Sequence, residues 1–162
     1  MLNNDLSQQI KRNFPYKPTE EQENAVKSFA EFLFSPSADS VFLMKGYAGT
    51  GKTTLTSALV RTLDSLQRKV ILLAPTGRAA KVFSGYAEHP AYTIHKKIYR
   101  QKVFSNETDN FVANQNLHRN TLFIVDEASM IANEGLSGGH FGSGRLLDDL
   151  VQYVYNGLGC RL

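Results

Sequence analysis

The most constraining feature of the chain is a glycine-rich segment that runs from Gly46 to Thr53 and reads GYAGTGKT. It matches the pattern G-x-x-x-x-G-K-T. An apolar run, Val41–Met44, precedes it, and apolar residues at helical spacing follow from Leu55. A buried strand, a glycine turn and a helix start together point backbone N–H groups at a phosphate chain. The segment therefore predicts the phosphate loop of an enzyme that binds a nucleoside triphosphate.

The side chains of this loop fit ATP and Mg²⁺ as cofactors. Lys52 supplies a mobile cation for the β- and γ-phosphates, and the hydroxyl of Thr53 can reach Mg²⁺. The residues that we expect to contact the nucleotide are Gly46, Ala48, Gly49, Thr50, Gly51, Lys52, Thr53 and Thr54.

Two adjacent carboxylates follow another apolar run, Leu122–Val125. A strand at this run would place Asp126 and Glu127 at the carboxyl edge of a sheet, where open α/β folds bind ligands. Asp126 would hold Mg²⁺, and Glu127 would orient and deprotonate an attacking water. Taken alone, the same pattern also describes a strand that runs into an acidic helix start. Together with the phosphate loop, it favours an ATPase in which Lys52 and Glu127 are catalytic.

The apolar runs predict an α/β fold. Val41–Met44, Val70–Ala74 and Leu122–Val125 are short and continuous, as strands of a parallel sheet buried on both faces are. Helical patterns lie between and around them. Thr19 and Gln22 form a capping-box signature before one helix, a second helix follows the phosphate loop, and a third is expected at 145–155. The sequence therefore predicts a parallel sheet flanked by helices, in one domain over residues 1–162.

Composition excludes several classes of protein. Hydrophobic residues make up 42% of the chain and charged residues 20%, which argues against a disordered tail or a pure coiled coil. No apolar run approaches the ~18 residues of a membrane span, so we expect no membrane partner. The single cysteine, Cys160, excludes an intramolecular disulfide and favours a cytoplasmic setting.

Basic charge is concentrated in one part of the chain. Residues 78–102 contain six Lys or Arg and one acid, Glu88, whereas the whole chain has a net charge of +3. This window carries +5, so the rest carries −2. Such a concentration favours an anionic partner, although a solvated basic surface would have the same composition.

Four sequence elements, in order, resemble the motifs of one helicase group. Ala74–Lys81 (APTGRAAK) resembles the DNA-contacting motif Ia of the RecD-like and Dda-like helicases of superfamily 1. Thr93–His95 resembles their T-x-H element, and Asp126–Met130 (DEASM) resembles their motif II. Gln22 falls where the family keeps a glutamine that reads adenine, although it also has a local role in its capping box.

The resemblance implies a RecA-like ATPase domain that drives a motor 5′ to 3′ along single-stranded DNA. Such a domain is similar to that of the alpha subunit of exodeoxyribonuclease V, and this resemblance implies a role in DNA repair and recombination. The residues that the resemblance places on DNA are Thr76, Arg78, Lys81 and His95. Tyrosines that could stack on bases are Tyr86, Tyr92 and Tyr99, although aromatic residues in such places more often pack in the protein.

The resemblance also assigns a role to residues 99–116, which lie between the T-x-H element and motif II. In this family an insertion here often forms a pin that splits the duplex, so we expect a hairpin with Phe104 or Phe111 near its working end. A plain surface hairpin is an equally good interpretation of this segment.

The family needs a second RecA-like domain, with an arginine finger, and no part of these 162 residues matches it. We therefore expect an N-terminal fragment whose sheet is incomplete at its C-terminus and which alone is inactive as a helicase. The next strand would begin near Arg161 and lie between Val41–Met44 and Leu122–Val125. Two other interpretations stay open: a nucleotide-binding module without turnover, and a stand-alone P-loop phosphotransferase.

Overall fold

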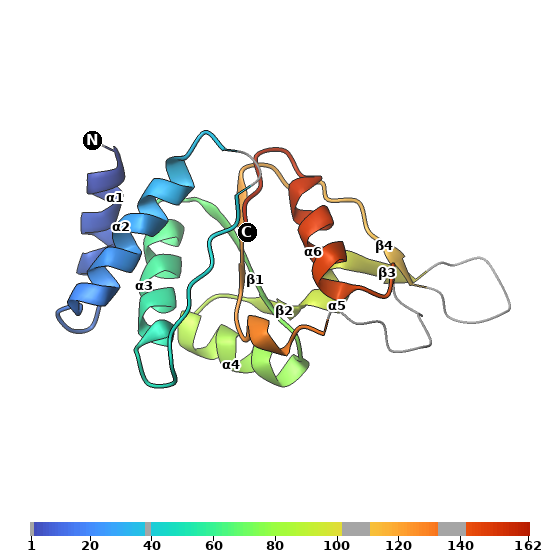
Figure 1. Cartoon of the computed structure of the whole chain (residues 1–162), viewed down its shortest axis with the longest axis horizontal. Helices are drawn as coiled ribbons and strands as arrows, with labels where there is room; N and C mark the ends of the chain where they lie inside the picture. Colours follow the sequence, from blue (N-terminus) through green and yellow to red (C-terminus); the bar gives the residue numbers. More distant parts are fainter. Residues whose placement is uncertain (1, 38–39, 102–110, 133–141) are drawn as a thin grey trace, which may run out of the picture.

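The computed structural model describes residues 2–37, 40–101, 111–132 and 142–162. Its main sheet has the parallel strands β1 (Lys69–Ala74), β2 (Ala91–Thr93) and β5 (Thr121–Val125), in the order β2-β1-β5. Helices cover the sheet on both sides (Figure 1). The predicted α/β fold with a parallel, helix-flanked sheet is thus confirmed.

Alternate residues of the strands face two separate cores. Leu72 of β1 and Leu122 of β5 belong to one buried cluster, whereas their neighbours Leu73 and Phe123 belong to the other. This alternation is what a strand requires when both of its faces are covered. It explains why these strands read as continuous apolar runs.

The first core lies under three helices: α1 (Leu2–Arg12), α2 (Glu20–Phe34) and α3 (Lys52–Ser65). They occupy one side of the sheet in Figure 1. The second core lies under α5 (Ile94–Ile98) and α6 (Leu146–Tyr155). No helix within the described ranges is long and apolar enough to cross a membrane.

The predicted capping box at the start of α2 is confirmed. The Thr19 N–H donates to Oε1 of Gln22 at 3.0 Å, and the Gln22 N–H donates to Oγ1 of Thr19 at 3.2 Å. These two bonds satisfy backbone donors that a helix start leaves without partners.

The predicted strand at Val41–Met44 does not form. Its described link to the sheet is one hydrogen bond, from the Phe42 N–H to the Leu162 carbonyl at 3.0 Å, and a strand needs a repeated ladder. Arg161 in turn forms an isolated parallel β-bridge with Leu122 of β5. Arg161 and Leu162 therefore lie between β5 and residues 41–44, where the sequence placed the next strand.

A second, two-stranded sheet lies within residues 99–116. Strands β3 (Tyr99–Gln101) and β4 (Phe111–Ala113) pair antiparallel, with Gln101 opposite Phe111. Phe104, one of the two residues expected at the working end of a pin, lies outside the described residues. The pin itself stays a prediction.

The carboxyl ends of the main strands meet at one edge of the sheet, the lower edge in Figure 1. The helix α4 (Gly77–Ala87) follows β1 there, and a short 3₁₀ helix, η1 (Ala128–Met130), follows β5. The glycine-rich segment before α3 reaches the same edge. This edge therefore collects the elements that carry the sequence motifs.

Candidate nucleotide site at the carboxyl edge of the sheet

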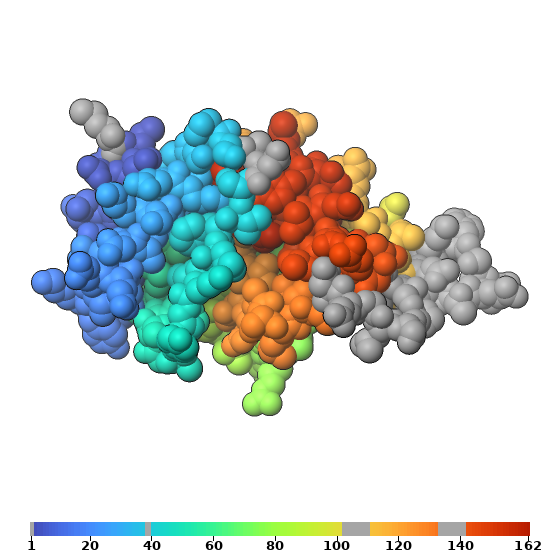
Figure 2. Space-filling model, in the orientation of Figure 1, coloured from blue at the N-terminus to red at the C-terminus, as the bar shows by residue number. Residues whose placement is uncertain are grey.

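The glycine-rich loop makes its turn through two left-handed residues. Gly49 has φ of +79° and Gly51 has φ of +81°, a backbone region that costs other residues about 1–2 kcal/mol each. Residues 46–50 are exposed at the surface, and Figure 2 shows this segment in teal at the lower edge. The glycines at these positions are thus required by the backbone.

Polar contacts inside the loop hold its lysine. The Lys52 ammonium donates to the carbonyls of Gly46 and Tyr47, at 2.6 and 2.7 Å. The Thr50 hydroxyl donates to the same Tyr47 carbonyl at 2.8 Å. Lys52 therefore lies inside the curve of the loop.

The helix behind the loop is firmly packed. Leu55, Ala58 and Leu59 of α3 are buried in the first core. On the other face of the first turn, Thr53 is exposed and Thr54 is half-buried. Thr53 is therefore exposed at the start of a helix whose opposite face is buried.

Asp126 and Glu127 stand at the end of β5, as predicted. The Asp126 N–H donates to the Leu73 carbonyl at 3.0 Å, which extends the ladder with β1 by one bond. Glu127 then adopts a left-handed conformation, with φ of 55° and ψ of 36°, and its side chain is exposed. Such backbone costs about 1–2 kcal/mol in a residue with a side chain, and strain of this kind clusters at functional sites.

The structure adds to the site a residue that neither the phosphate-loop pattern nor the carboxylate pattern contains. Tyr86 of α4 was one of three tyrosines that could stack on bases or pack in the protein, and it packs: its hydroxyl donates to Oδ2 of Asp126 at 2.7 Å and its ring stacks on Phe83 at 5.2 Å. Burial, the hydrogen bond to Asp126 and the charges of Asp126 and Glu127 raise the pKa of the Tyr86 phenol. The spacing of Phe83 and Tyr86 in the sequence places both rings on one face of a helix, but it does not predict the bond to Asp126.

The oxygen donors at this edge fit Mg²⁺. A carboxylate from Asp126 and a hydroxyl from Thr53 are hard ligands, and Mg²⁺ in nucleotide sites is held by few protein oxygens with the phosphates completing its shell. These two residues would hold the ion.

Gln22 reaches the loop while it caps α2. Its Oε1 accepts from the Thr19 N–H, and its Nε2 donates to the Gly51 carbonyl at 3.5 Å. The carboxamide thus joins the start of α2 to the phosphate loop. The adenine-reading role stays a prediction.

The residues that the resemblance places on DNA lie at the start of α4 and on α5. Thr76 is the N-cap of α4, and its hydroxyl accepts from the Ala79 N–H at 3.2 Å. Arg78 and Lys81 are exposed, and within the described part of the chain neither has an ion-pair partner. Their charges are therefore available to an anion.

A groove of about 510 Å³ lies between α4 and β2. Lys81, Tyr92 and Lys96 are among the residues that line it, whereas Arg78 and His95 are not. The predicted DNA residues therefore do not all share one groove. Lys96 lines it beside Lys81, although the motif comparison had not singled it out.

His95 lies beside this groove in a less exposed setting. It is half-buried, with its ring 5.7 Å from that of Tyr99, and burial lowers its pKa. The imidazole is therefore neutral at pH 7. At this pH His95 can contribute a hydrogen bond but no positive charge.

The other two candidate stacking tyrosines differ from each other. Tyr99 is buried, and its hydroxyl donates to Oδ2 of Asp149 at 2.6 Å, so it does not present a face for a base. Tyr92 is 42% exposed, with the Lys97 ammonium 5.9 Å from its ring centre. Among the three tyrosines, only Tyr92 keeps an exposed ring.

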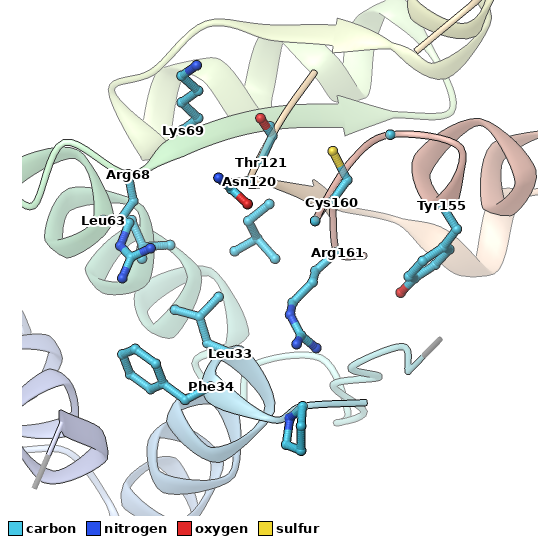
Figure 3. Close-up of a pocket in the computed structure, with 14 residues that line it drawn as sticks. Leu33, Phe34, Leu63, Arg68, Lys69, Asn120, Thr121, Tyr155, Cys160 and Arg161 are labelled. Carbon is cyan, nitrogen blue, oxygen red and sulfur yellow. The ribbon is translucent and has the colours of Figure 1, made fainter. Parts of the chain in front are cut away.

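A second cavity, of about 360 Å³, lies where β1 and β5 begin, at the other end of the strands from the phosphate loop (Figure 3). Leu33 and Phe34 of α2 line it with Cys160 and Arg161. None of the residues predicted for ATP, Mg²⁺ or DNA lines this cavity.

A family model described as an AAA domain matches residues 17–138. The chain belongs to the AAA domain family. The matched range contains Gln22, the phosphate loop and both carboxylates at the end of β5. The chain is thus an AAA domain with a P-loop, RecA-like fold, and the carboxyl edge holds its candidate nucleotide site.

Three relatives of this AAA domain are much longer proteins. The multifunctional conjugation protein TraI of Escherichia coli K12 is 32% identical over 107 residues, which cover 62% of this chain and 6% of TraI. The ATP-dependent DNA helicase dda of Enterobacteria phage T4 is 37% identical over 90 residues, which cover 54% of this chain and 20% of the helicase. An uncharacterized protein of Methanocaldococcus jannaschii is 28% identical over 149 residues, which cover 85% of this chain and 12% of that protein. The chain spans a fifth or less of each relative's length.

Proposed function

We propose that this AAA domain is the ATP-hydrolysing motor domain of a DNA helicase of the RecD-like and Dda-like group, which moves 5′ to 3′ along single-stranded DNA. The observation that carries the proposal is the course of α4. It begins with the exposed Thr76 and Arg78 and carries Tyr86, which bonds to Asp126 at the nucleotide site. The names of two relatives, a conjugation protein and a DNA helicase, support the same class.

In this proposal two residues of the phosphate loop and two at the strand end act on ATP, Mg²⁺ and water. The Lys52 ammonium exchanges its two loop carbonyls for the β- and γ-phosphate oxygens of ATP. Thr53 and Asp126 hold Mg²⁺, which neutralises charge on the phosphates. Glu127, held at the end of β5 by its left-handed turn, orients the attacking water and accepts its proton.

DNA would be held by its phosphates, without base reading. The Thr76 hydroxyl, Arg78 and Lys81 supply donors and charge at the start of α4, and the groove beside them adds Lys96. Neutral His95 adds a hydrogen bond. Residues 99–116 would form the strand-separating pin.

A motor of this group works with two RecA-like domains, and we propose that this chain supplies the first. The second would bring the arginine finger and the other half of the DNA track. The setting that the resemblance implies is cytoplasmic DNA repair and recombination.

ATP turnover with and without single-stranded DNA tests the proposal in the full-length protein. We expect oligo(dT) to stimulate hydrolysis and Lys52→Ala to abolish it, whereas Lys45→Ala removes an exposed lysine just before the loop and should leave turnover intact. Nucleotide binding without turnover, with or without DNA, would favour the binding module. Transfer of phosphate to a small acceptor, insensitive to DNA, would favour the phosphotransferase.

A further inference from the structure

We propose that Tyr86 is a positioning residue for Asp126: its hydroxyl fixes the carboxylate in the orientation that binds Mg²⁺. The contact that carries this is the 2.7 Å hydrogen bond from the Tyr86 hydroxyl to Oδ2 of Asp126. The inference rests on the proposed function, since that function makes Asp126 a metal ligand. Nothing in the phosphate-loop or motif II patterns contains Tyr86, which lies 40 residues before the aspartate.

The tyrosine is held in place independently of Asp126. Its ring stacks on Phe83, and its carbonyl accepts from the Ser57 hydroxyl of α3 at 3.0 Å. Beyond it, the ion pair Arg61–Glu88 at 3.1 Å and a 3.5 Å contact between Nε2 of His89 and Oδ1 of Asp64 join the end of α4 to α3. The hydroxyl is therefore set by packing, and the carboxylate follows it.

Asp126 depends on this contact for its orientation. Its backbone is fixed by the bond to Leu73, but within the described residues Tyr86 is the one side chain that bonds to its carboxylate. The phenol uses one oxygen, Oδ2, and leaves Oδ1 to the metal. Hydrogen-bond partners of this kind hold metal ligands in place, and their loss typically lowers metal affinity by about 10–100-fold.

Tyr86→Phe is the sharpest test, because it removes the hydroxyl and keeps the ring against Phe83. We would titrate Mg²⁺ into the full-length protein with methylanthraniloyl-ADP and follow the tightening of nucleotide binding. The midpoint should rise about 10-fold, while affinity without metal stays the same. A purely structural role would instead lower both affinities and the melting temperature together.

Tyr99→Phe is a matched control. It breaks a second phenol–aspartate pair, Tyr99 with Asp149, on another part of the fold. The Mg²⁺ midpoint of this variant should equal that of the parent. An equal shift in both variants would overturn the inference, because the effect would then follow from general loosening of the fold.

Asp126→Asn separates the inference from the function on which it rests. This variant should lose the Mg²⁺-dependent tightening altogether. If it keeps the parent's midpoint, Asp126 is no metal ligand, and both proposals are overturned at this site. If it loses the effect but Tyr86→Phe keeps the parent's midpoint or lowers it, only the role of Tyr86 is overturned.

Discussion

Replacing Gly51 by alanine tests how far the phosphate loop depends on its left-handed backbone. Gly51 has φ of +81°, and a Cβ added there would collide with the Gln22 carboxamide. The backbone conformation costs alanine about 1–2 kcal/mol. Moving Gln22 aside adds about 0.5–1 kcal/mol, because its contact with the loop and its capping bond are weakened. We therefore expect Gly51→Ala to lower the free energy of unfolding by about 2 kcal/mol in total.

Two other glycines separate the contributions. Gly49 has φ of +79° but open space around it, so Gly49→Ala should show the backbone cost alone. Gly77, the first residue of α4, has neither a positive φ nor a close neighbour. Gly77→Ala should stabilise the fold by about 0.4–1 kcal/mol, since it restricts the unfolded chain. From most to least stable, the three variants should thus rank as Gly77→Ala, Gly49→Ala and Gly51→Ala.

Thermal melting followed by circular dichroism measures this ranking. For a domain of this size 1 kcal/mol corresponds to about 2–4 °C, so Gly51→Ala should melt about 4–8 °C below the parent. Adding Gln22→Ala to Gly51→Ala should cost less than the sum of the two single effects, because the collision disappears. The reasoning from loop geometry is wrong if Gly51→Ala has the same melting temperature as Gly77→Ala. It is also wrong if the effects of Gly51→Ala and Gln22→Ala are strictly additive in the double variant.

Three further predictions concern the charged groups. Glu127→Gln should keep nucleotide binding and slow hydrolysis by about 10²–10⁴-fold in a single-turnover assay, and loss of binding would instead make Glu127 a metal ligand. In a salt series with oligo(dT), Arg78→Ala and Lys81→Ala should each reduce the slope of log affinity against log salt by about one. His95→Ala should weaken binding at pH 7.5 without changing this slope. Burial lowers the pKa of His95 and keeps its side chain neutral at this pH. Burial alone would raise the pKa of Asp149, but hydrogen bonds from Ser143 and Tyr99 outweigh this effect, and the net pKa is lowered. Asp149 therefore stabilises the fold at pH values above its unfolded pKa of about 3.9, and this stability is lost as the pH falls through the folded pKa. Asp149→Asn should therefore flatten the acid side of a melting-temperature profile, and an unchanged profile would contradict the assignment.

Local patterns predicted the parts of the site that depend on a few consecutive residues. The phosphate loop, the carboxylates at the end of β5 and the capping box at Thr19 each need particular residue types at fixed spacing. The expected helices at α2, α3 and α6 carry apolar stripes long enough to be recognised. The position of Arg161 between β5 and residues 41–44 followed from the order of strands that such folds share.

What the sequence did not predict depends on contacts between distant segments. Strand β2 has three residues and gained its place by pairing with β1, which no local pattern encodes. The apolar run at Val41–Met44 has strand-like composition, yet its described ladder is a single bond. The helix α1 was overlooked because its apolar residues are few, although Leu2, Leu6 and Ile10 stand at regular spacing of four and the last two are buried.

The role of α4 is the finding that changes the interpretation of the motifs most. From the sequence, motif Ia at Thr76 and motif II at Asp126 were two separate sites, one for DNA and one for ATP. In the structure a single short helix carries both the exposed basic residues of the first and the tyrosine that bonds to the second. A force on the start of α4 from bound DNA would therefore act on the Asp126 carboxylate through one rigid element, without a chain of intermediate contacts. If this is how DNA stimulates turnover, Tyr86→Phe should reduce stimulation by oligo(dT) more than it reduces basal hydrolysis at saturating Mg²⁺, and equal losses in the two rates would leave α4 a passive support.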